Sequence, residues 1–481
     1  MPISIYNSLT RKKEPFQPLN PPQVNMYTCG VTVYDDCHIG HARSLYIFDV
    51  IRRYLKYRDY KVNFVRNITD IDDKIIKRAN ELEIEWSELV QRYIASYKRD
   101  LGLLGIREGI LDKDKEEPRA TGNIPEMVAY IKDLVDKGYA YVTDSGVYFS
   151  VRKFKDYGKL SGQGIDQMLS GARIEPNEDK QDPLDFALWK KSKPGEPSWP
   201  SMWGDGRPGW HIECSVMSQK FLKTDTLDIH AGGRDLIFPH HENEIAQSEA
   251  LTGKPFAKYW IHHGLLTING QKMAKSLGNF VTIKDFIAKY KIADFLKMFF
   301  LTTHYSHPID YTEDKIEEAK RALDRIFILF KNIDKHLSMQ KSYSSDKKNF
   351  EILGAEKRFI EAMDDDFNTP KALSVIFELV NMANKNIDDL DFIFSAKNTI
   401  KLFLVEIFGI YLPKILEALD LNPVIHMLGK YESIQDIIRE RERLRKNNRF
   451  IEADQIRKEL EDKGIILEDT KDGKTTWRKK L

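Results

Sequence analysis

Cysteine is nearly absent from this chain of 481 residues, which has only three: Cys29, Cys37 and Cys214. Such an odd and sparse set does not build a disulfide framework, so we expect reduced thiols. Metal binding or simple burial accounts for them better than cross-linking does.

Long apolar runs are also missing, so we expect no membrane-spanning helix. The first residues, MPISIYNSLTRKKEPF, lack the apolar core of a signal peptide, and we expect a cytoplasmic protein. No charge of one sign prevails, because 74 basic residues face 73 acidic ones. This balance neither demands nor excludes nucleic acid, since one basic face can bind RNA in a protein of neutral sum.

The first part of the chain has the pattern of a βαβ unit. A β-rich apolar segment over 24–33 predicts a strand, helical spacing of apolar residues predicts a helix from Gly40 to about Arg58, and YKVNFVRNIT predicts a second strand. A glycine at the first turn favours a nucleotide-binding parallel sheet. The charged stretch over 72–104 predicts one long helix.

The length of 481 residues exceeds that of a single core, so we expect roughly three to five units. We expect an α/β fold, with a Rossmann-type parallel-sheet domain that carries an insertion, then an α-helical bundle and a small C-terminal domain. The expected ranges are 1–112 and 208–250 for the two halves of the sheet domain, 113–207 for the insertion, 251–310 for a linking region, 311–422 for the bundle and 423–481 for the C-terminal domain.

The strand-to-helix turn carries His38, Gly40 and His41. Two histidines there can be buried or exposed without a role, and their spacing across a turn suits a metal poorly. A helix N-terminus offers free N–H groups, and Gly40 lets a ligand approach the backbone. Imidazoles at that place can donate hydrogen bonds to a phosphoryl group in its transition state.

A second motif, KMAKS, lies between Gly270 and Gly278, about 230 residues later. Two lysines three apart are usually a solvated surface. Together with the histidine turn, however, Lys272 and Lys275 suggest a mobile clamp for a leaving pyrophosphate.

Four residues far apart in the sequence can form a zinc site. His240 and Glu244 in FPHHENE share one helical face, and Cys29 and Cys214 flank expected strands of the sheet. Thiolates, an imidazole and a carboxylate suit Zn²⁺. The alternative is two ordinary buried cysteines beside a polar helix face.

The histidine turn and the KMAKS loop together resemble the two motifs of class I aminoacyl-tRNA synthetases. The second motif departs from that family's pattern, because Ala274 stands where the family usually has serine. From end to end the chain is similar to the cysteinyl-tRNA synthetase family. The stretches that carry this resemblance are MYTCGVTVYDDCHIGHAR, VRNITDIDDKI, RPGWHIECSVM, DIHAGGRDLIFPHHENEIAQSEA, KMAKSLGN and EADQIRKEL.

The resemblance implies one Zn²⁺ per chain, bound by Cys29, Cys214, His240 and Glu244, that takes the thiol of L-cysteine directly. Cysteine and serine are nearly isosteric, and an apolar pocket separates such pairs only modestly. Zinc favours a thiolate over a hydroxyl, so no editing domain is needed. His241, which is adjacent to His240, and Cys37 are not ligands in this pattern.

The resemblance also implies roles at the ATP and amino-acid sites. The catalytic residues it implies are His38, His41, Lys272 and Lys275, which neutralise charge while L-cysteine attacks Mg²⁺-bound ATP. The residues it implies at the nucleotide are Gly40, Gly232, Gly233, Asp235 and Lys275. The amino-acid contacts it implies are Thr69, Trp210 and His230. Gly232, Gly233 and Asp235 can equally be an ordinary strand-end turn, and Trp210 can equally be core.

The C-terminal third lacks catalytic motifs. The resemblance implies that it binds tRNA(Cys), with an anticodon-binding domain over 423–481 and Trp477 as a base-stacking platform. A monomer is expected. Two other functions remain open at this point: a cysteine ligase with a small amine acceptor, against which the long C-terminal region argues, and a silent tRNA-binding paralogue, which Ala274 would mark. A zinc hydrolase is excluded by the four-ligand set, because hydrolases keep an open water position.

Overall fold

The structure is a computed structural model of the chain. It describes residues 2–106, 117–164, 168, 179–274, 277–338, 349–411, 434–447, 449–462, 465–469 and 475–479. Within that part, every helix is too short or too polar to span a bilayer.

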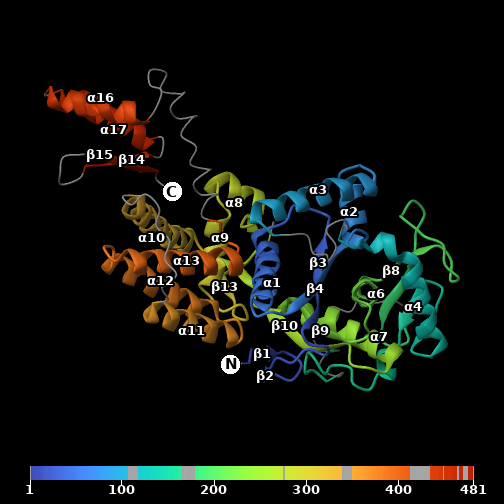
Figure 1. Ribbon diagram of the computed structural model, residues 1–481. Coiled ribbons are helices and arrows are strands. Elements are labelled where there is room, and N and C mark those ends of the chain that lie inside the picture. The colour runs from blue at the N-terminus through green and yellow to red at the C-terminus, as the bar shows by residue number, and fades with distance from the viewer. Residues whose placement is uncertain are drawn as a thin grey trace.

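A parallel sheet of four strands forms the centre of the molecule (Figure 1). Its order is β10-β9-β3-β4, and all three pairings are parallel. The strands are β3 (Gln23–Thr32), β4 (Lys61–Thr69), β9 (Leu227–Gly233) and β10 (Ala257–His263). Helix α1 (Ile39–Tyr57) connects β3 to β4, as the βαβ pattern predicts. The expected α/β fold is confirmed, and the sheet extends beyond residue 250, the expected end of its second half.

The stretch over 72–104 is two helices, so the expectation of one long helix is wrong. Helix α2 (Asp73–Glu81) and helix α3 (Trp86–Leu104) are separated by the four residues 82–85. Glu83 between them has a φ of 54°, which a continuous helix does not allow. The Trp86 ring packs edge-on against Trp199 of the insertion at 6.0 Å, a tertiary contact at the start of α3.

The described residues of the insertion form a small antiparallel sheet, and α4 is the longest helix among them. Its strands have the order β5-β6-β7-β8. Its elements are η1 (Ala120–Asn123), α4 (Ile124–Asp136), β5 (Ala140–Val142), β6 (Gly146–Phe149), η2 (Val151–Lys153), β7 (Phe186–Lys191) and β8 (Gly206–Pro208). The chain then re-enters the parallel sheet through α6 (Trp210–Leu222), and β9 is followed by η3 (Arg234–Leu236), the π-turn η4 (Ile237–His241) and α7 (Glu242–Thr252).

A short arm leaves the end of β10. It consists of β11 (Leu266–Ile268) and β12 (Gln271–Lys272), and β11 also pairs with β13 (Ile309–Tyr311). Helices α8 (Ile283–Tyr290) and α9 (Asp294–Leu301) lie between the arm and β13 in the chain.

The C-terminal third contains a helical bundle and a separate small unit. The bundle has α10 (Glu313–Ser338), α11 (Phe350–Asp364), α12 (Thr369–Lys385), α13 (Leu390–Lys401) and the π-turn η6 (Leu402–Ile407). The small unit has α16 (Ile434–Lys446), α17 (Phe450–Asp462), β14 (Ile465–Asp469) and β15 (Thr475–Lys479). At the other end of the chain, β1 (Ser4–Asn7) and β2 (Lys12–Pro15) form a hairpin.

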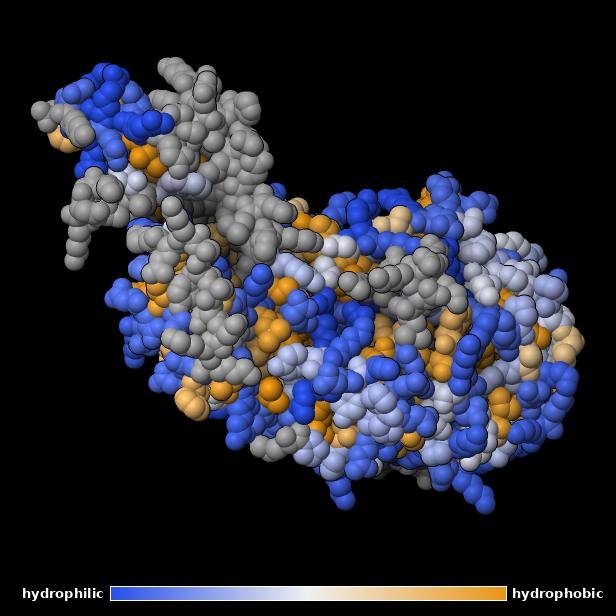
Figure 2. All heavy atoms as spheres, in the orientation of Figure 1, coloured by the Kyte–Doolittle hydropathy of each residue, from blue (hydrophilic) through white to orange (hydrophobic). Residues whose placement is uncertain are grey.

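The buried apolar residues that the structure describes divide into three clusters. The bundle shares one continuous core with α1, α3 and part of the sheet, and the insertion packs with α6 and α7 into a second. The small C-terminal unit has a core of its own around Ile437, Leu460 and Ile465. Figure 2 shows a mostly hydrophilic surface over the main body in this view.

Candidate catalytic site

Four potential metal ligands meet beside the parallel sheet. The ligand atoms of Cys29, Cys214, His240 and Glu244 all lie within 4.8 Å of one another. The two sulfurs are 3.8 Å apart, Cys214 Sγ lies 3.6 Å from His240 Nε2, and Nε2 lies 2.8 Å from Glu244 Oε1. Three of the four residues are buried and Cys29 is half-buried. A soft divalent cation suits two thiols, an imidazole and a carboxylate in this arrangement.

An irregularity in β3 places the first cysteine. The register of β3 against β4 shifts between Thr28 and Val31, which re-aims the residues between them. Only glycine fits at position 30, because a Cβ there would lie 1.6 Å from the Asn67 carbonyl oxygen. The Gly30 N–H donates to Asn67 Oδ1 at 2.9 Å, and Cys214 Sγ approaches the same oxygen at 3.8 Å.

The π-turn η4 places the histidine above α7. Phe238 inside it has extended φ/ψ angles of −136° and 132°, so the turn is kinked just before His240. His240 Nδ1 lies 3.0 Å from His211 Nδ1, which leaves Nε2 to face Cys214. Such hydrogen bonds to the second ring nitrogen orient a ligating histidine. Sequence reasoning missed His211, although it stands one helical turn before Cys214 in α6.

A second set of potential ligands overlaps the first. Cys29, His230, His241 and Glu244 also come together. His230 Nε2 lies 2.6 Å from Glu244 Oε2, and His241 Nδ1 lies 2.8 Å from His262 Nε2. This set has one thiol where the first has two, so the first is the better match for zinc.

The buried cluster has strongly shifted proton affinities. Burial raises the pKa of the Cys29 thiol, while the hydrogen bond with Cys29 lowers the pKa of Cys214 to about 6. Burial opposes the charged form of His240, but Glu244 and Cys214 outweigh it and raise the pKa to about 10. A bound dication would hold both sulfurs as thiolates.

The histidine turn forms the start of α1. The His41 N–H donates to His38 Nδ1 at 3.2 Å, the His38 N–H donates to His41 Nδ1 at 3.3 Å, and the rings stack at 3.7 Å. Burial lowers the pKa of His38 to about 4 and that of His41 well below its usual value. Both rings are therefore neutral near pH 7. Because each Nδ1 accepts a hydrogen bond, each proton is on Nε2, which makes both Nε2–H groups donors.

Gly40 packs closely against the side chain of His38. A Cβ at Gly40 would lie 2.8 Å from Cε1 and Nδ1 of His38 and 3.4 Å from Met273 Cε. The imidazole of His38 therefore fills the space that a side chain at position 40 would need.

The segment that follows the KMAKS motif lies against the histidine turn, although about 230 residues separate the two motifs in the sequence. The Ile39 N–H donates to the Val281 carbonyl at 3.0 Å, and the His38 ring contacts Phe280 edge-on at 5.4 Å. Lys272 is exposed at the end of β12, and the Asn279 side chain joins Ala274 N–H to the Lys272 carbonyl. Lys275 lies outside the described residues.

The strand-end turn after β9 packs tightly. A Cβ on Gly232 would lie 2.7 Å from the His241 ring, and one on Gly233 would lie 2.3 Å from Asp235 Oδ1. The Asp235 side chain is exposed. Its charge acts to raise the pKa of His38, but burial lowers that pKa by more.

The three expected amino-acid contacts surround the cluster at different depths. Trp210 is 36% exposed and stacks on His240 at 4.1 Å, so it is not core. His230 is fully buried beneath the cluster, stacked on Trp260 at 4.6 Å. The hydroxyl of Thr69 donates to Glu213 Oε2 at 2.7 Å.

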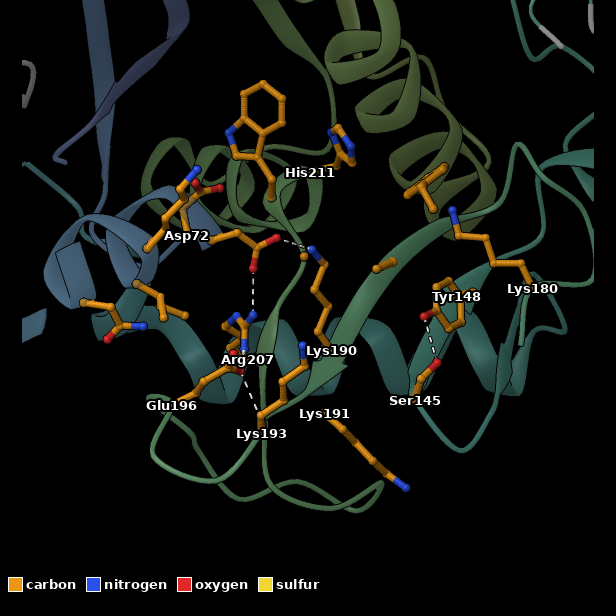
Figure 3. A pocket seen from close by; sticks show the side chains of 18 of the residues that line it. Asp72, Ser145, Tyr148, Lys180, Lys190, Lys191, Lys193, Glu196, Arg207 and His211 are labelled. Atoms are coloured by element: carbon orange, nitrogen blue, oxygen red, sulfur yellow. Dashed lines mark hydrogen bonds and ion pairs between the residues drawn. The ribbon is translucent and has the colours of Figure 1, made fainter. Parts of the chain in front are cut away.

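A cleft of about 1080 Å³ opens beside Trp210 and His211 (Figure 3). It lies between α2 and the insertion sheet. Its basic residues outnumber its acidic ones, and they are Lys77, Lys180, Lys190, Lys191, Lys193 and Arg207. Asp73 pairs with Lys190 at 2.6 Å and with Arg207 at 2.7 Å. The sequence pattern did not reveal this cleft, because its walls come from the insertion and α2.

Comparisons with known proteins cover the whole chain. A model of class I (C) tRNA synthetase catalytic domains matches residues 15–321, a DALR domain matches 358–412, and a cysteinyl-tRNA ligase anticodon-binding domain matches 431–478. A cysteine--tRNA ligase of Thermodesulfovibrio yellowstonii is 48% identical over 100% of both chains, and one of Geobacillus sp. is 49% identical over 99% of both.

Solved structures of other synthetases share the fold. A Mycobacterium tuberculosis methionyl-tRNA synthetase in complex with methionyl-adenylate aligns with a TM-score of 0.61 at 16% identity, over 82% of this chain and 93% of that one. An Agrobacterium radiobacter LeuRS in a ternary complex aligns with a TM-score of 0.62 at 12% identity, over 84% and 86%. At these identities the likeness concerns the fold.

Proposed function

Because the chain belongs to the cysteine--tRNA ligase family, we propose how its residues carry out that reaction. The enzyme activates L-cysteine with ATP to cysteinyl-adenylate and transfers the cysteinyl group to the 3′ end of tRNA(Cys). The small-acceptor ligase and the silent paralogue are set aside on this ground.

The cluster of Cys29, Cys214, His240 and Glu244 is the proposed zinc site, and its geometry carries the proposal. The mutual distances within 4.8 Å and the burial of three of the four support it. Bound zinc would supply a soft acceptor that prefers the substrate thiolate to the hydroxyl of serine. Trp210, stacked on His240, closes one side of that pocket, and Thr69 and His230 complete the proposed amino-acid contacts.

The histidine turn and the lysine loop form the proposed adenylation site for Mg²⁺-bound ATP. The Nε2–H groups of His38 and His41 donate to phosphate oxygens as their charge grows, without carrying charge themselves. Lys272 and Lys275 are the proposed partners of the leaving pyrophosphate. Positioning and charge neutralisation do most of the work, since the reaction needs little side-chain acid–base chemistry.

The nucleotide is proposed to lie over the adjoining turns. Gly40, Gly232 and Gly233 keep these turns compact, and Asp235 offers a carboxylate for a polar contact. The compactness is supported by the short distances that a Cβ would have at each glycine.

The tRNA is proposed to contact two regions. The basic cleft beside His211 takes the acceptor end, since its lysines face a polyanion and it opens beside the proposed amino-acid pocket. The small C-terminal unit takes the anticodon, with Trp477 as a stacking platform. Lys331 of α10 lies 5.5 Å from the centre of the Trp477 ring. An enzyme that charges tRNA for translation is proposed to act in the cytoplasm, as a monomer.

Two assays test the function. The purified protein should catalyse cysteine-dependent exchange between pyrophosphate and ATP, and it should charge a tRNA with a GCA anticodon. Serine should support neither reaction measurably. Exchange without charging would indicate a different acceptor, and charging without exchange dependent on cysteine would contradict the proposal.

A further inference from the structure

Arg43 is a buried cation that binds backbone instead of a carboxylate. It stands in α1 five residues after His38, and its side chain is fully buried. Nη1 donates to the carbonyls of Gly264 and Leu265 at 2.7 and 2.9 Å, and Nη2 donates to those of Tyr305 and His307 at 3.2 and 2.6 Å. Among the described residues no carboxylate forms an ion pair with it.

The chemistry of the site explains why arginine is there. The four carbonyls come from two separate segments that cross here. Those of Tyr305 and Leu265 also accept from the N–H groups of Gly264 and Ile309, so Arg43 gives them a second donor and joins the two segments a second time. A planar guanidinium can serve both segments at once, whereas the compact ammonium of lysine cannot. Burial lowers the pKa of Arg43 to about 10, so it stays charged at neutral pH.

The first of these segments is the root of the arm that carries the lysine loop. Gly264 and Leu265 lead directly into β11, which turns into β12 and ends at Lys272. The two segments cross closely at this point, since a Cβ on Gly264 would lie 2.2 Å from the His307 carbonyl. Arg43 therefore ties the helix of the histidine turn to the base of the arm.

The second segment continues into the bundle. The Tyr305 hydroxyl donates to Asp366 Oδ1 at 2.7 Å, and His304 Nε2 lies 2.9 Å from the Asp366 carbonyl oxygen. The same arginine thus contacts the arm and the segment that joins the arm's sheet to the bundle.

We propose that Arg43 is a positioning residue for adenylate formation, which sets the distance between the histidine turn and the lysine arm. The inference rests on the roles proposed above for His38 and Lys272. Arg43 itself touches no reacting atom. Loss of Arg43 slows the chemical step. A shift of the His38 donor or the Lys272 cation by a fraction of an ångström weakens its fit to the transition state.

The test compares Arg43→Lys with Arg52→Lys in cysteine-dependent pyrophosphate exchange. Arg52 is the matched control: it is a buried arginine of the same helix, and its partner is Asp49. Arg43→Lys should lower kcat by about 10- to 100-fold, with the KM for cysteine within about twofold and the bound metal unchanged. Hydrogen exchange should accelerate in the peptide over 264–272. Arg52→Lys should show neither change.

A second variant serves if Arg43→Lys does not fold. Asp310 holds the tip of the arm from the surface, since its Oδ1 accepts from Thr267 Oγ1 at 2.6 Å and from the Gly270 N–H at 2.7 Å. Asp310→Ala should lower kcat about 3- to 10-fold without changing the KM for cysteine.

Two results overturn the inference: wild-type kcat in both arm variants, or a loss of kcat that Arg52→Lys reproduces. His38→Ala separates this failure from failure of the site itself. If His38→Ala lowers kcat and the arm variants do not, only the role of Arg43 is wrong. If His38→Ala is without effect, the proposed adenylation site is wrong.

Discussion

At the scale of single residues, the two histidines of the turn are neutral near pH 7, which supports their proposed role as donors. Their stacking and their backbone hydrogen bonds fix the tautomer, and burial holds the pKa of His38 at about 4. Folding thus lowers this pKa from its ordinary value of 6.5. The unfolded chain takes up the proton first on acidification, so His38 contributes stability that is present above about pH 6.5 and is lost as the pH falls toward 4.

The neutral-donor role predicts the effect of substitutions at His38. His38→Ala should lower kcat for pyrophosphate exchange by about 100-fold or more, because one transition-state donor is lost. His38→Gln should retain clearly more activity, since its amide N–H can replace Nε2–H. Rates measured at saturating substrate should show no titration of His38 between pH 6 and 8. An activity that falls as the pH rises through about 6.5 would mean that the imidazolium is the active form.

Some site residues could be predicted from local spacing and others could not. His240 and Glu244 are one helical turn apart, so their proximity follows from the sequence. Cys29 and Cys214 are 185 residues apart, and only the sheet brings their sulfurs to 3.8 Å. The β3 irregularity at Gly30 and the kink at Phe238 are set by tertiary contacts that no short pattern encodes.

At the scale of elements, the insertion and α2 form the walls of the basic cleft. Lys190 of β7 reaches across to Asp73 of α2, and Arg207 bridges Asp73 and Glu196 (Figure 3). These ion pairs hold the walls of the cleft together in the absence of tRNA. A phosphate can compete with Asp73 for the exposed Lys190.

The cleft predicts a separation between the two steps of the reaction. Lys190→Glu should raise the KM for tRNA about tenfold and reduce the salt dependence of tRNA binding, because a phosphate contact is lost. Cysteine-dependent pyrophosphate exchange should stay within about twofold. Lys254→Glu is the matched control, since Lys254 also forms an exposed pair, with Asp225 at 2.7 Å, away from the cleft. Equal effects of both variants on charging would remove the cleft from the tRNA path.

Some helices and strands could be predicted from sequence patterns, and one break between helices could not. The βαβ unit and the bundle follow from apolar periodicity, because each buries one continuous face. The break at Glu83 does not, since residues 72–104 have helical propensity throughout and the contact of Trp86 with the insertion lies far along the chain.

At the scale of the whole molecule, three cores suggest which parts depend on one another. The bundle shares its core with the sheet domain, so the two should unfold together. The C-terminal unit has its own core, and an exposed contact, Lys331 to the Trp477 carbonyl at 2.9 Å, joins it to the bundle.

Removal of residues 423–481 should therefore spare activation and impair charging. Pyrophosphate exchange should stay within about twofold, while aminoacylation of tRNA(Cys) should fall at least tenfold. Trp477→Ala in the full chain should affect charging in the same direction. Loss of both steps on truncation would show that the unit supports the catalytic fold, and loss of neither would contradict its anticodon role.

The central claim is that a zinc ion in the buried cluster recognises the substrate sulfur. Cys214→Ser should reduce bound zinc and cysteine activation together. Cys37→Ser should change neither, because Cys37 is a buried core residue outside both potential metal sites.

The most direct measurement is X-ray absorption at the zinc edge of the full-length protein, with and without L-cysteine, alongside its metal content. We predict one zinc per chain, two sulfur ligands in the free enzyme and one more when cysteine is bound, with no change on adding serine. An unchanged sulfur count in a fully active enzyme would contradict direct thiolate recognition. The shape of the pocket alone would then have to separate cysteine from serine, two side chains of nearly equal size.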